Sequence, residues 1–354
     1  MTGREPPPAH AHASSPFDEA VLAAYLRDHV HGLRGPIRLE ALSGGQSNPT
    51  YRLTAANGRS YVLRKQPEGE LLPSAHAVDR EYRIITALAR TDVPVPRTYC
   101  YCADRSIIGT PFFVMDFAQG RHFWDPALPS LGQADRAALW DDINSVIARL
   151  HNVDYSAIGV ADYGRPGNYF ERQIGRWSKQ YRASETGTIE SMDRLIEWLP
   201  QHIIDDPASS IVHGDFRLDN LIVHAHEPRI VAVLDWELST LGHPLADFSY
   251  HAMAWRLTQE QFRGMAGKDL AALRIPAERE YVERYCARTG RDRLDARDWE
   301  FCIVFSMFRL AAILQGIAKR ALVGTSNDAD AVGVGARSRA VADVAWQQVE
   351  AMRG

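Results

Sequence analysis

Short apolar segments separated by Gly, Pro and polar residues dominate the chain up to about residue 117. Segments of this kind favour β-strands. The expected strands lie at 37–40, 50–54, 61–65 and 111–117, and Cys100 and Cys102 alternate along a further one. Helices are predicted from Phe17 to about His31 and from about Ser74, a candidate N-cap, to Ala89. The pattern therefore predicts a small β-rich lobe over residues 16–117.

The segment 118–354 is predicted to form a larger, mainly helical lobe. Stretches rich in Ala and Leu with helical periodicity occupy 134–151, 168–185, 189–204, 277–289, 297–322 and 337–352. Short apolar strands are expected at 211–212, 221–223 and 229–234, and the segment from Val323 to Ser338 is expected to be a long loop. The fold class is thus α+β, with a small antiparallel sheet and one helix in the first lobe. Residues 1–15, which lack an apolar core, are expected to be disordered.

A polar segment between two of these strands carries the main candidate chemistry. His213-Gly214-Asp215 opens it and Asn220 closes it. A tight loop anchored by buried strands holds reactive side chains well, and Gly214 lets the backbone turn sharply. Asp215 is the candidate general base for an attacking hydroxyl, a role worth roughly 10²–10⁴ in rate.

A second acidic position, Asp235, follows at the tip of the apolar strand 229–234. Asp235 and Asn220 offer the hard oxygen ligands that suit Mg²⁺ bound together with nucleotide phosphates. A base and such a ligand pair are what phosphoryl transfer from a nucleotide needs. Either segment alone would equally fit a capped turn or an ordinary strand-end carboxylate, but the two together predict a kinase.

Residues 213–220, followed by Asp235, resemble the catalytic loop and metal-binding segment of the aminoglycoside phosphotransferase and choline kinase superfamily. The resemblance covers about residues 37 to 350 and implies a protein-kinase-like two-lobed fold, with ATP and Mg²⁺ as cofactors. It also implies that Asp247 supports the catalytic loop, a structural role also expected of His213. Gly214 stands where protein kinases have Arg, and only eleven residues separate Asp235 from Asp247, too few for an activation segment. The expected protein is a small-molecule kinase.

The upstream half of the chain supplies the expected nucleotide contacts. A Gly-Gly hairpin loop can cover phosphates with its backbone N–H groups, and the strand at 111–117 falls where the resemblance places the adenine hinge. The predicted residues are Gly44, Gly45 and Ser47 in the hairpin loop, and Met115, Asp116 and Ala118 at the hinge. No Walker sequence is present and no Gly-x-Gly-x-x-Gly follows a strand, so P-loop and Rossmann readings have no support.

Two adjacent cations, Arg64 and Lys65, end the strand at 61–65. The resemblance implies that one of them reaches the nucleotide phosphates and is held by Glu81 on the following helix. Adjacent strand residues point to opposite faces, so only one can do so. Aligning Val62-Leu63 to the family favours Arg64, whereas counting back from Glu81 permits Lys65.

Composition narrows the class of protein. The formal net charge is −4, which argues against nucleic-acid binding. Apolar runs do not approach the 18 residues of a membrane span. Four cysteines are few for 354 residues, and the N-terminus lacks signal-peptide form, so we expect a cytoplasmic protein. Oligomeric state is not predicted.

The acceptor is the least determined part of the reaction. Residues 251–354 hold 16 Lys and Arg against 13 Asp and Glu, which disfavours polycationic acceptors and admits an anionic one. Residues 71–81, with Val62 to Lys65, resemble the kinase-like domain that precedes an acyl-CoA dehydrogenase domain in some animal proteins. That resemblance implies phosphorylation of a hydroxyl on an acyl-CoA, with Arg256, Arg263 and Arg309 as candidate contacts to CoA phosphates. A dehydrogenase domain is not expected in this chain.

Three alternatives stay open at this point. The acceptor is an aminoglycoside or another amino alcohol in the first alternative. In the second, the chain is a catalytically silent nucleotide-binding module, which would have no need to keep all the expected polar residues. In the third, it is a metal-dependent phosphoesterase, which would need several His and Asp ligands for two metals. Only His213 stands beside the loop, and His243 has a structural explanation next to Pro244.

Overall fold

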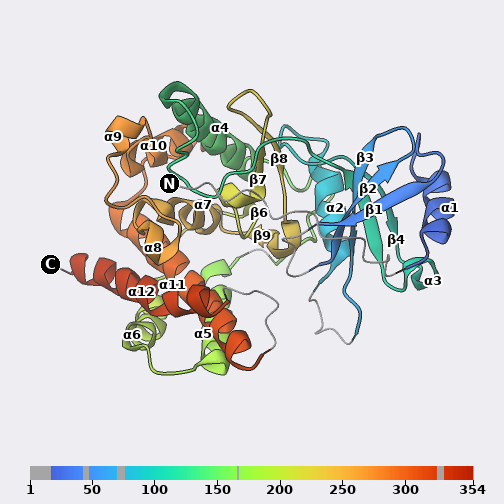
Figure 1. Cartoon of the computed structure of the whole chain (residues 1–354). Helices are drawn as coiled ribbons and strands as arrows, with labels where there is room; N and C mark the ends of the chain where they lie inside the picture. The colour runs from blue at the N-terminus through green and yellow to red at the C-terminus, as the bar shows by residue number, and fades with distance from the viewer. Residues whose placement is uncertain (1–16, 43–47, 70–75, 166, 325–330, 354) are drawn as a thin grey trace. The chain divides into compact units, whose positions relative to one another are not determined.

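The computed structural model describes residues 17–42, 48–69, 76–165, 167–324 and 331–353. The chain divides into two compact units (Figure 1). The first consists of Met1–Tyr82 and Arg97–Phe117, and the second of Arg83–Pro96 and Ala118–Gly354. The segment 1–15, expected to be disordered, lies outside the described residues.

The first unit is built on a five-stranded sheet in the order β1-β2-β3-β5-β4, and all neighbouring strands are antiparallel. The strands are β1 (Ile37–Ala41), β2 (Thr50–Ala55), β3 (Ser60–Lys65), β4 (Thr98–Cys102) and β5 (Phe112–Asp116). Helices α1 (Glu19–His29) and α3 (Arg105–Ile108) belong to this unit, and α2 (Val78–Leu88) begins in it. The antiparallel sheet predicted from the apolar pattern is confirmed. The short α3 carries too few residues to show a period.

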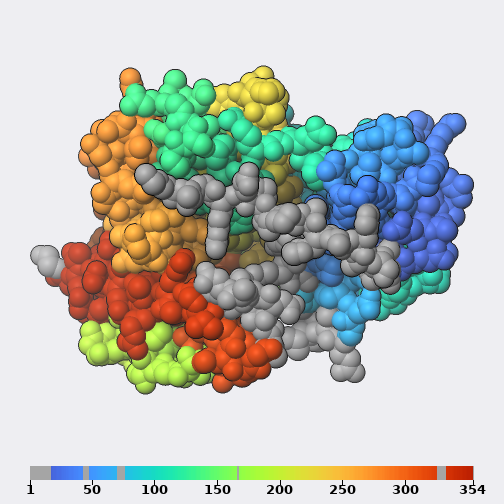
Figure 2. Space-filling model, in the orientation of Figure 1, coloured from blue at the N-terminus to red at the C-terminus, as the bar shows by residue number. Residues whose placement is uncertain are grey.

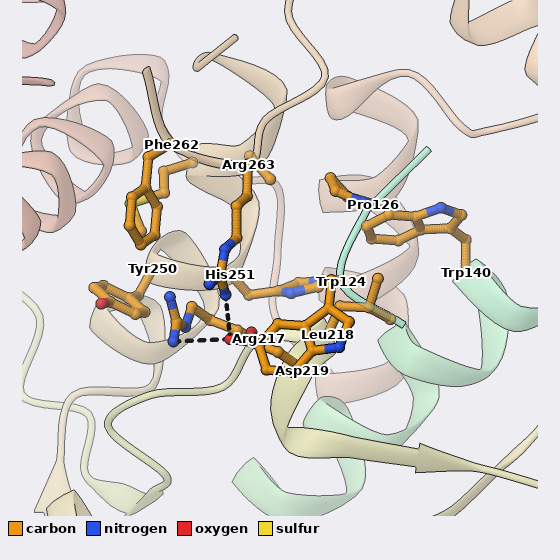
Figure 3. Close-up of a pocket in the computed structure, with 12 residues that line it drawn as sticks. Trp124, Pro126, Trp140, Arg217, Leu218, Asp219, Tyr250, His251, Phe262 and Arg263 are labelled. Carbon is orange, nitrogen blue, oxygen red and sulfur yellow. Dashed lines mark hydrogen bonds and ion pairs between the residues drawn. The ribbon is translucent and has the colours of Figure 1, made fainter. Parts of the chain in front are cut away.

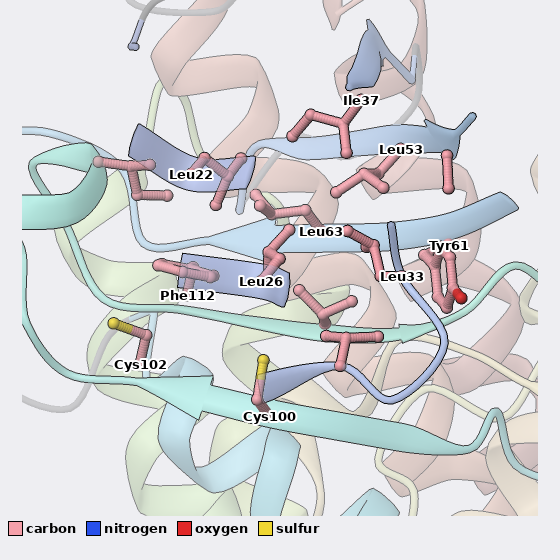
Figure 4. Close-up of a cluster of buried hydrophobic side chains, with 14 residues drawn as sticks. Leu22, Leu26, Leu33, Ile37, Leu53, Tyr61, Leu63, Cys100, Cys102 and Phe112 are labelled. Atoms are coloured by element: carbon pink, nitrogen blue, oxygen red, sulfur yellow. The ribbon is translucent and has the colours of Figure 1, made fainter. Parts of the chain in front are cut away.

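One face of this sheet packs against α1 in a common apolar core (Figure 4). Asp18 starts α1 by accepting a hydrogen bond from the Ala20 N–H at 2.8 Å, and Leu22 and Leu26 are fully buried beneath the helix. Cys100 and Cys102 lie in the same core, so the prediction that they share one face of a strand is confirmed. Burial raises the pKa of the Cys100 thiol to about 12, which keeps it protonated and unreactive.

The second unit is mainly helical. Its longer helices are α4 (Gln133–His151), α5 (Tyr169–Ser184), α6 (Glu190–Trp198), α7 (Pro244–Ala252), α10 (Glu278–Thr289), α11 (Ala296–Leu322) and α12 (Ala331–Ala351). Two single-turn helices, α8 (Gln259–Phe262) and α9 (Leu270–Leu273), join them. Two small antiparallel sheets pair β6 (Ser210–Val212) with β9 (Thr240–Gly242), and β7 (Leu221–Val223) with β8 (Ile230–Val233). β9 was not predicted.

Helix α11 is the core of this unit. It packs against α5, α7 and α12, and α12 also contacts α6. Figure 2 shows the red surface of the C-terminal helices next to the yellow-green surface of the α5–α6 region. By length and composition α11 is apolar enough to cross a membrane, but 83% of its most apolar window is buried inside the protein. A helix that is apolar on all sides is expected at the centre of a large core.

The start of α12 corrects the loop predicted from Val323 to Ser338, because α12 already begins at Ala331. Gly335 and Ser338 looked like helix breakers in the sequence. In the structure a Cβ on Gly335 would lie 2.6 Å from the Ala318 Cα, and the Ser338 hydroxyl donates to the Ala311 carbonyl at 2.8 Å. Both residues therefore serve close packing of α12 on α11. The part 325–330 lies outside the described residues.

Candidate active site

The loop between β6 and β7 is held by hydrogen bonds to Asp247, a buried residue of α7. The backbone N–H groups of His213 and Gly214 donate to the two Asp247 carboxylate oxygens at 2.7 and 2.8 Å. His151 Nε2 lies 3.3 Å from the same carboxylate. Burial alone would raise the pKa of Asp247, but the hydrogen bonds from His151 and from the His213 backbone outweigh it and hold the pKa below its usual value. Asp247 is therefore an ionised anchor for the loop.

Gly214 occupies a backbone conformation that only glycine adopts readily. Its φ is +84°, and a Cβ at this position would lie 2.7 Å from the Leu238 carbonyl oxygen. The Gly214 carbonyl accepts a hydrogen bond from Arg309, which α11 buries beneath the loop at 5% exposure. The Arg309 guanidinium lies over the Tyr250 ring, 4.6 Å from its centroid. The turn before Asp215 is thus held by close packing against Leu238 and by the hydrogen bond from Arg309.

His213 ties the loop to the end of β8. Its Nε2 donates to the Leu234 carbonyl at 2.8 Å, and its Nδ1 accepts from the Asp215 N–H at 3.1 Å. These two bonds assign the neutral Nε2–H tautomer. Both ring nitrogens of His213 are thus used in hydrogen bonds within the fold, as expected for the structural role predicted for His213.

The structure brings Asp215 and Asn220 into direct contact, and a backbone hydrogen bond joins Asn220 to the residue before Asp235. The Asn220 side-chain NH₂ donates to the Asp215 carbonyl at 2.8 Å and to the Asp215 carboxylate at 3.1 Å. Across the β7–β8 hairpin, the Leu234 N–H donates to the Asn220 carbonyl at 2.8 Å. Asp235 follows Leu234 in a left-handed conformation with φ +65°. Groups far apart in the sequence therefore converge at one end of the small sheet.

This arrangement suits a magnesium ion chemically. Because the Asn220 NH₂ group is used by Asp215, the amide oxygen is the atom left to bind a cation. Asp235, which follows Leu234 on the opposite strand of the hairpin, is the other candidate ligand. Within the described residues, no group of three or more His, Cys, Asp and Glu side chains forms a metal cluster.

The electrostatics of Asp215 favour proton acceptance. Burial raises the pKa of its carboxyl above the ordinary value, although Arg217 opposes the rise. Arg217 Nε lies 3.0 Å from one Asp215 oxygen. Arg217 Nη2 also lies 3.1 Å from the Asp219 carboxylate. The candidate base is therefore held by a guanidinium on one side and by Asn220 on the other.

A pocket in the second unit opens beside this group (Figure 3). Arg217 and Asp219 line it together with Phe262, Arg263 and the exposed Trp124. Its empty volume is about 460 Å³, including the part open to solvent. The sequence analysis missed Trp124 and Phe262, because isolated aromatic residues far apart in the chain carry no periodic or motif signal.

Of the three arginines expected to meet CoA phosphates, only Arg263 lines this pocket. Arg256 instead forms ion pairs with Glu278 and Glu300, the latter at 2.7 Å. Arg309 is buried under the catalytic loop. The expectation is therefore corrected for Arg256 and Arg309, whose guanidiniums are used inside the fold.

In the first unit, the structure distinguishes between the two candidate cations. Arg64 Nε lies 2.9 Å from the Glu81 carboxylate, whose other oxygen accepts from the buried Asn48 amide at 2.7 Å. Lys65 pairs with Glu68 instead, at 2.8 Å. The pairing with Glu81 thus belongs to Arg64, the alternative that the alignment favoured.

The remaining predicted nucleotide contacts are placed in part. Met115 is buried in β5, and the Asp116 carboxylate accepts from the Tyr99 hydroxyl at 2.6 Å and from Arg59 at 3.1 Å. These bonds turn the Asp116 side chain toward β4, so a nucleotide contact from this residue would have to use its backbone. Ala118 is the first residue of the second unit's longer segment. Gly44, Gly45 and Ser47 lie outside the described residues.

Comparisons with known proteins find a matching family and several similar relatives. A family model described as the phosphotransferase enzyme family matches residues 38–299. Acyl-CoA dehydrogenase family member 10 of Mus musculus is 46% identical over 314 residues, which are 88% of this chain and 29% of that protein. Member 11 of Rattus norvegicus is 40% identical over 322 residues, 89% of this chain and 41% of that protein. The chain spans less than half the length of these relatives.

Solved structures show the same fold. A putative aminoglycoside phosphotransferase from Ralstonia eutropha is 51% identical, with a TM-score of 0.86, and the match covers 94% of this chain and 98% of that one. An aminoglycoside phosphotransferase in complex with ADP and hygromycin B has a TM-score of 0.59 at 17% identity, covering 92% and 98%. A choline kinase from Cryptosporidium parvum has a TM-score of 0.61 at 11% identity, covering 95% and 96%. The last two likenesses concern the fold alone.

Proposed function

Because the chain belongs to the phosphotransferase enzyme family and is a small-molecule kinase, we propose that it transfers the γ-phosphoryl group of ATP to a hydroxyl of a small acceptor. The observation that supports this most directly is the contact between Asp215 and Asn220, with Asp235 next to them on the same hairpin. The side-chain hydrogen bonds of Asn220 and the backbone hydrogen bond from Leu234 hold the loop that carries the base against the end of β8. Phosphoryl transfer requires such positioning of base and metal ligands.

The roles of the residues follow from their contacts. Asp215 accepts the proton of the acceptor hydroxyl as that oxygen forms its bond to the γ-phosphorus, while the bond from the γ-phosphorus to the β-phosphate oxygen breaks and ADP leaves. Asn220 orients the Asp215 carboxylate through its amide. Asp247 and Gly214 hold the loop that carries the base.

Mg²⁺ and nucleotide fit the remaining residues. Asn220, through its amide oxygen, and Asp235 would hold Mg²⁺, which when bound neutralises charge on the phosphates. Arg64, oriented by Glu81, would contact the α- and β-phosphates, since its guanidinium is rigidly placed by that buried carboxylate. The complex of a structurally similar phosphotransferase with ADP supports the choice of an adenine nucleotide.

For the acceptor we propose a hydroxyacyl-CoA. The support is the similarity to two acyl-CoA dehydrogenase family members, of which this chain matches less than half. The competing acceptor is an aminoglycoside or another amino alcohol, and the 51% identity with a putative aminoglycoside phosphotransferase favours it. A mass-spectrometric screen of both acceptor classes would identify the true acceptor by the mass of one added phosphoryl group. Repeating the screen with GTP in place of ATP would test the choice of donor.

The chemical proposal is tested by Asp215→Ala. We expect this variant to lose acceptor-dependent ADP release by about 10²-fold or more, because the general base is gone, while Mg-ATP still raises the melting temperature. Unchanged turnover would refute the role of Asp215. A wild-type protein that binds Mg-ATP but phosphorylates no hydroxyl acceptor would instead support the silent-module alternative.

We propose a cytoplasmic location. Support comes from the cysteines, since Cys100, Cys102, Cys286 and Cys302 are all buried and free of disulfides. Free thiols are typical of reducing compartments. Fractionation of the producing cells with a tagged chain would test this proposal, and recovery in a membrane or secreted fraction would contradict it.

A further inference from the structure

Four charged side chains form a continuous chain of ion pairs from the candidate base to the pocket. Asp215 pairs with Arg217, Arg217 pairs with Asp219 at 3.1 Å, and Asp219 pairs with Arg263 at 2.6 Å. Arg263 is the most exposed of the four, with 37% of its side chain accessible, against 11% for Asp219. Because Asp219 accepts from two guanidiniums, it stays paired when Arg263 turns to another partner. Arg263 is therefore the member of this series of ion pairs that can exchange its partner for a ligand.

The surroundings of Arg263 hold its guanidinium at the pocket. Its charged group lies 5.0 Å from the centroid of the Trp124 ring and 5.8 Å from that of Phe262. The backbone of Arg263 has φ +46°, a left-handed conformation found mostly at Gly and Asn. A large side chain at this position therefore costs conformational free energy. In Figure 3 the Arg263 side chain points toward Arg217 and Asp219.

The remaining lining is mainly apolar, apart from the Tyr250 hydroxyl and the buried His251 ring. Leu218, Met253 and Ala254 line the pocket together with the buried ring of Trp140. The only carboxylate among the lining residues is Asp219, and it is already paired with two guanidiniums. An ammonium group entering here would lose water without gaining an unpaired carboxylate. A hydrocarbon chain, in contrast, would gain from leaving water.

We propose that Arg263 determines acceptor specificity in this pocket. Its guanidinium donates to an acyl oxygen, in a carboxylate or a thioester, carried by the same chain as the reacting hydroxyl, and the apolar side chains accept the hydrocarbon part. This inference rests on the proposed kinase function, because it takes the pocket beside Asp215 to be the acceptor site. It assigns Arg263 a recognition role, whereas Arg217 and Asp219 position the base.

The test compares four acceptors that share a six-carbon chain and the position of the hydroxyl. They are a hydroxyhexanoyl-CoA thioester, the free hydroxyhexanoate, the unsubstituted hexanol and an amino-hexanol. Variants Arg263→Gln and Arg263→Lys are measured with each, by turnover and by binding calorimetry. Lys268→Ala is the matched control, since it removes one positive charge from the same segment but is exposed and outside the pocket lining.

For the acyl-bearing acceptors we expect Arg263→Gln to raise KM and weaken binding about tenfold to a hundredfold, as loss of a charge-assisted hydrogen bond implies. The effect on kcat should be smaller, Arg263→Lys should restore part of the binding, and the hexanol should be unaffected. The acceptor that binds the wild type more tightly, the thioester or the free acid, identifies which acyl oxygen Arg263 recognises.

An equal loss for all acceptors, or none, would overturn the role of Arg263, as would preferential binding of the amino-hexanol. Failure of the kinase proposal looks different. In that case the wild type would bind the acyl compounds in an Arg263-dependent way but transfer no phosphoryl group to any of them. The binding affinities from calorimetry therefore test the role of Arg263 even where no turnover is measured.

Discussion

At the residue scale, two glycines of the second unit separate the effect of backbone conformation from that of close packing. Gly214 and Gly267 have nearly the same φ, +84° and +81°. A Cβ on Gly214 would meet the Leu238 carbonyl at 2.7 Å, whereas one on Gly267 would have nothing within 4 Å. A change to Ala therefore brings the same conformational strain at both positions and a steric clash only at Gly214.

We expect Gly267→Ala to lower the free energy of unfolding by about 1 kcal/mol, the usual cost of a left-handed non-glycine residue. Gly214→Ala should lower it further, by more than about 2 kcal/mol in total, and reduce kcat because Asp215 follows directly. Urea unfolding and turnover measure the two effects. Equal stability losses would contradict the clash with Leu238.

At the element scale, Asp247 joins α7 to the catalytic loop by two backbone hydrogen bonds, and its ionisation makes that connection dependent on pH. Its pKa is lower in the folded protein than the ordinary value of 3.8. A carboxyl with a depressed pKa stabilises the fold fully above its unfolded-state pKa, and this contribution is lost as the pH falls through the folded-state value. The connection is therefore intact at neutral pH and fails in acid.

Asp247→Asn should lower the free energy of unfolding at pH 7 by about 2–3 kcal/mol, because an amide cannot accept both N–H groups as a carboxylate does. The difference from the wild type should begin to shrink below about pH 3.8, where the unfolded-state carboxyl becomes protonated, and should disappear below the lower folded-state pKa. Urea midpoints at several pH values measure this. Asp135→Asn, at an exposed position on α4, is the control and should change little.

How far the sequence predicts these elements depends on whether a residue's neighbours are local. Strands β1 to β3 and helices α4, α5, α6, α10 and α11 follow from apolar period alone, and the Asp215, Asn220 and Asp235 pattern follows from a motif with fixed spacing. Helix α7 was not predicted, and α12 begins earlier than predicted. β9 has only three residues, too few to show alternation. The pocket lined by Trp124 and Arg263 could not be predicted, since these two residues meet only through the tertiary fold.

At the scale of the whole molecule, the second unit depends on the pairing of its two C-terminal helices. α11 is apolar on nearly all sides, and α12 covers part of it with the fully buried residues Val341, Ala342, Ala345 and Val349. Gly335 permits the close approach of the two backbones. Without α12, this side of α11 would be a contiguous apolar surface, which soluble proteins avoid.

Deleting residues 331–354 should therefore expose the α11 surface and turn the protein into an aggregating species that binds hydrophobic dyes. A milder variant, Gly335→Leu, should separate the helices without removing α12, because its side chain would enter the space of the Ala318 backbone. We expect this variant to stay soluble at low temperature and to lose about 2 kcal/mol or more of stability through overpacking. Soluble yield and melting temperature measure both variants. A truncated protein that remained soluble with the wild-type melting temperature would show that α11 is stabilised by its other neighbours, α5 and α7, without help from α12.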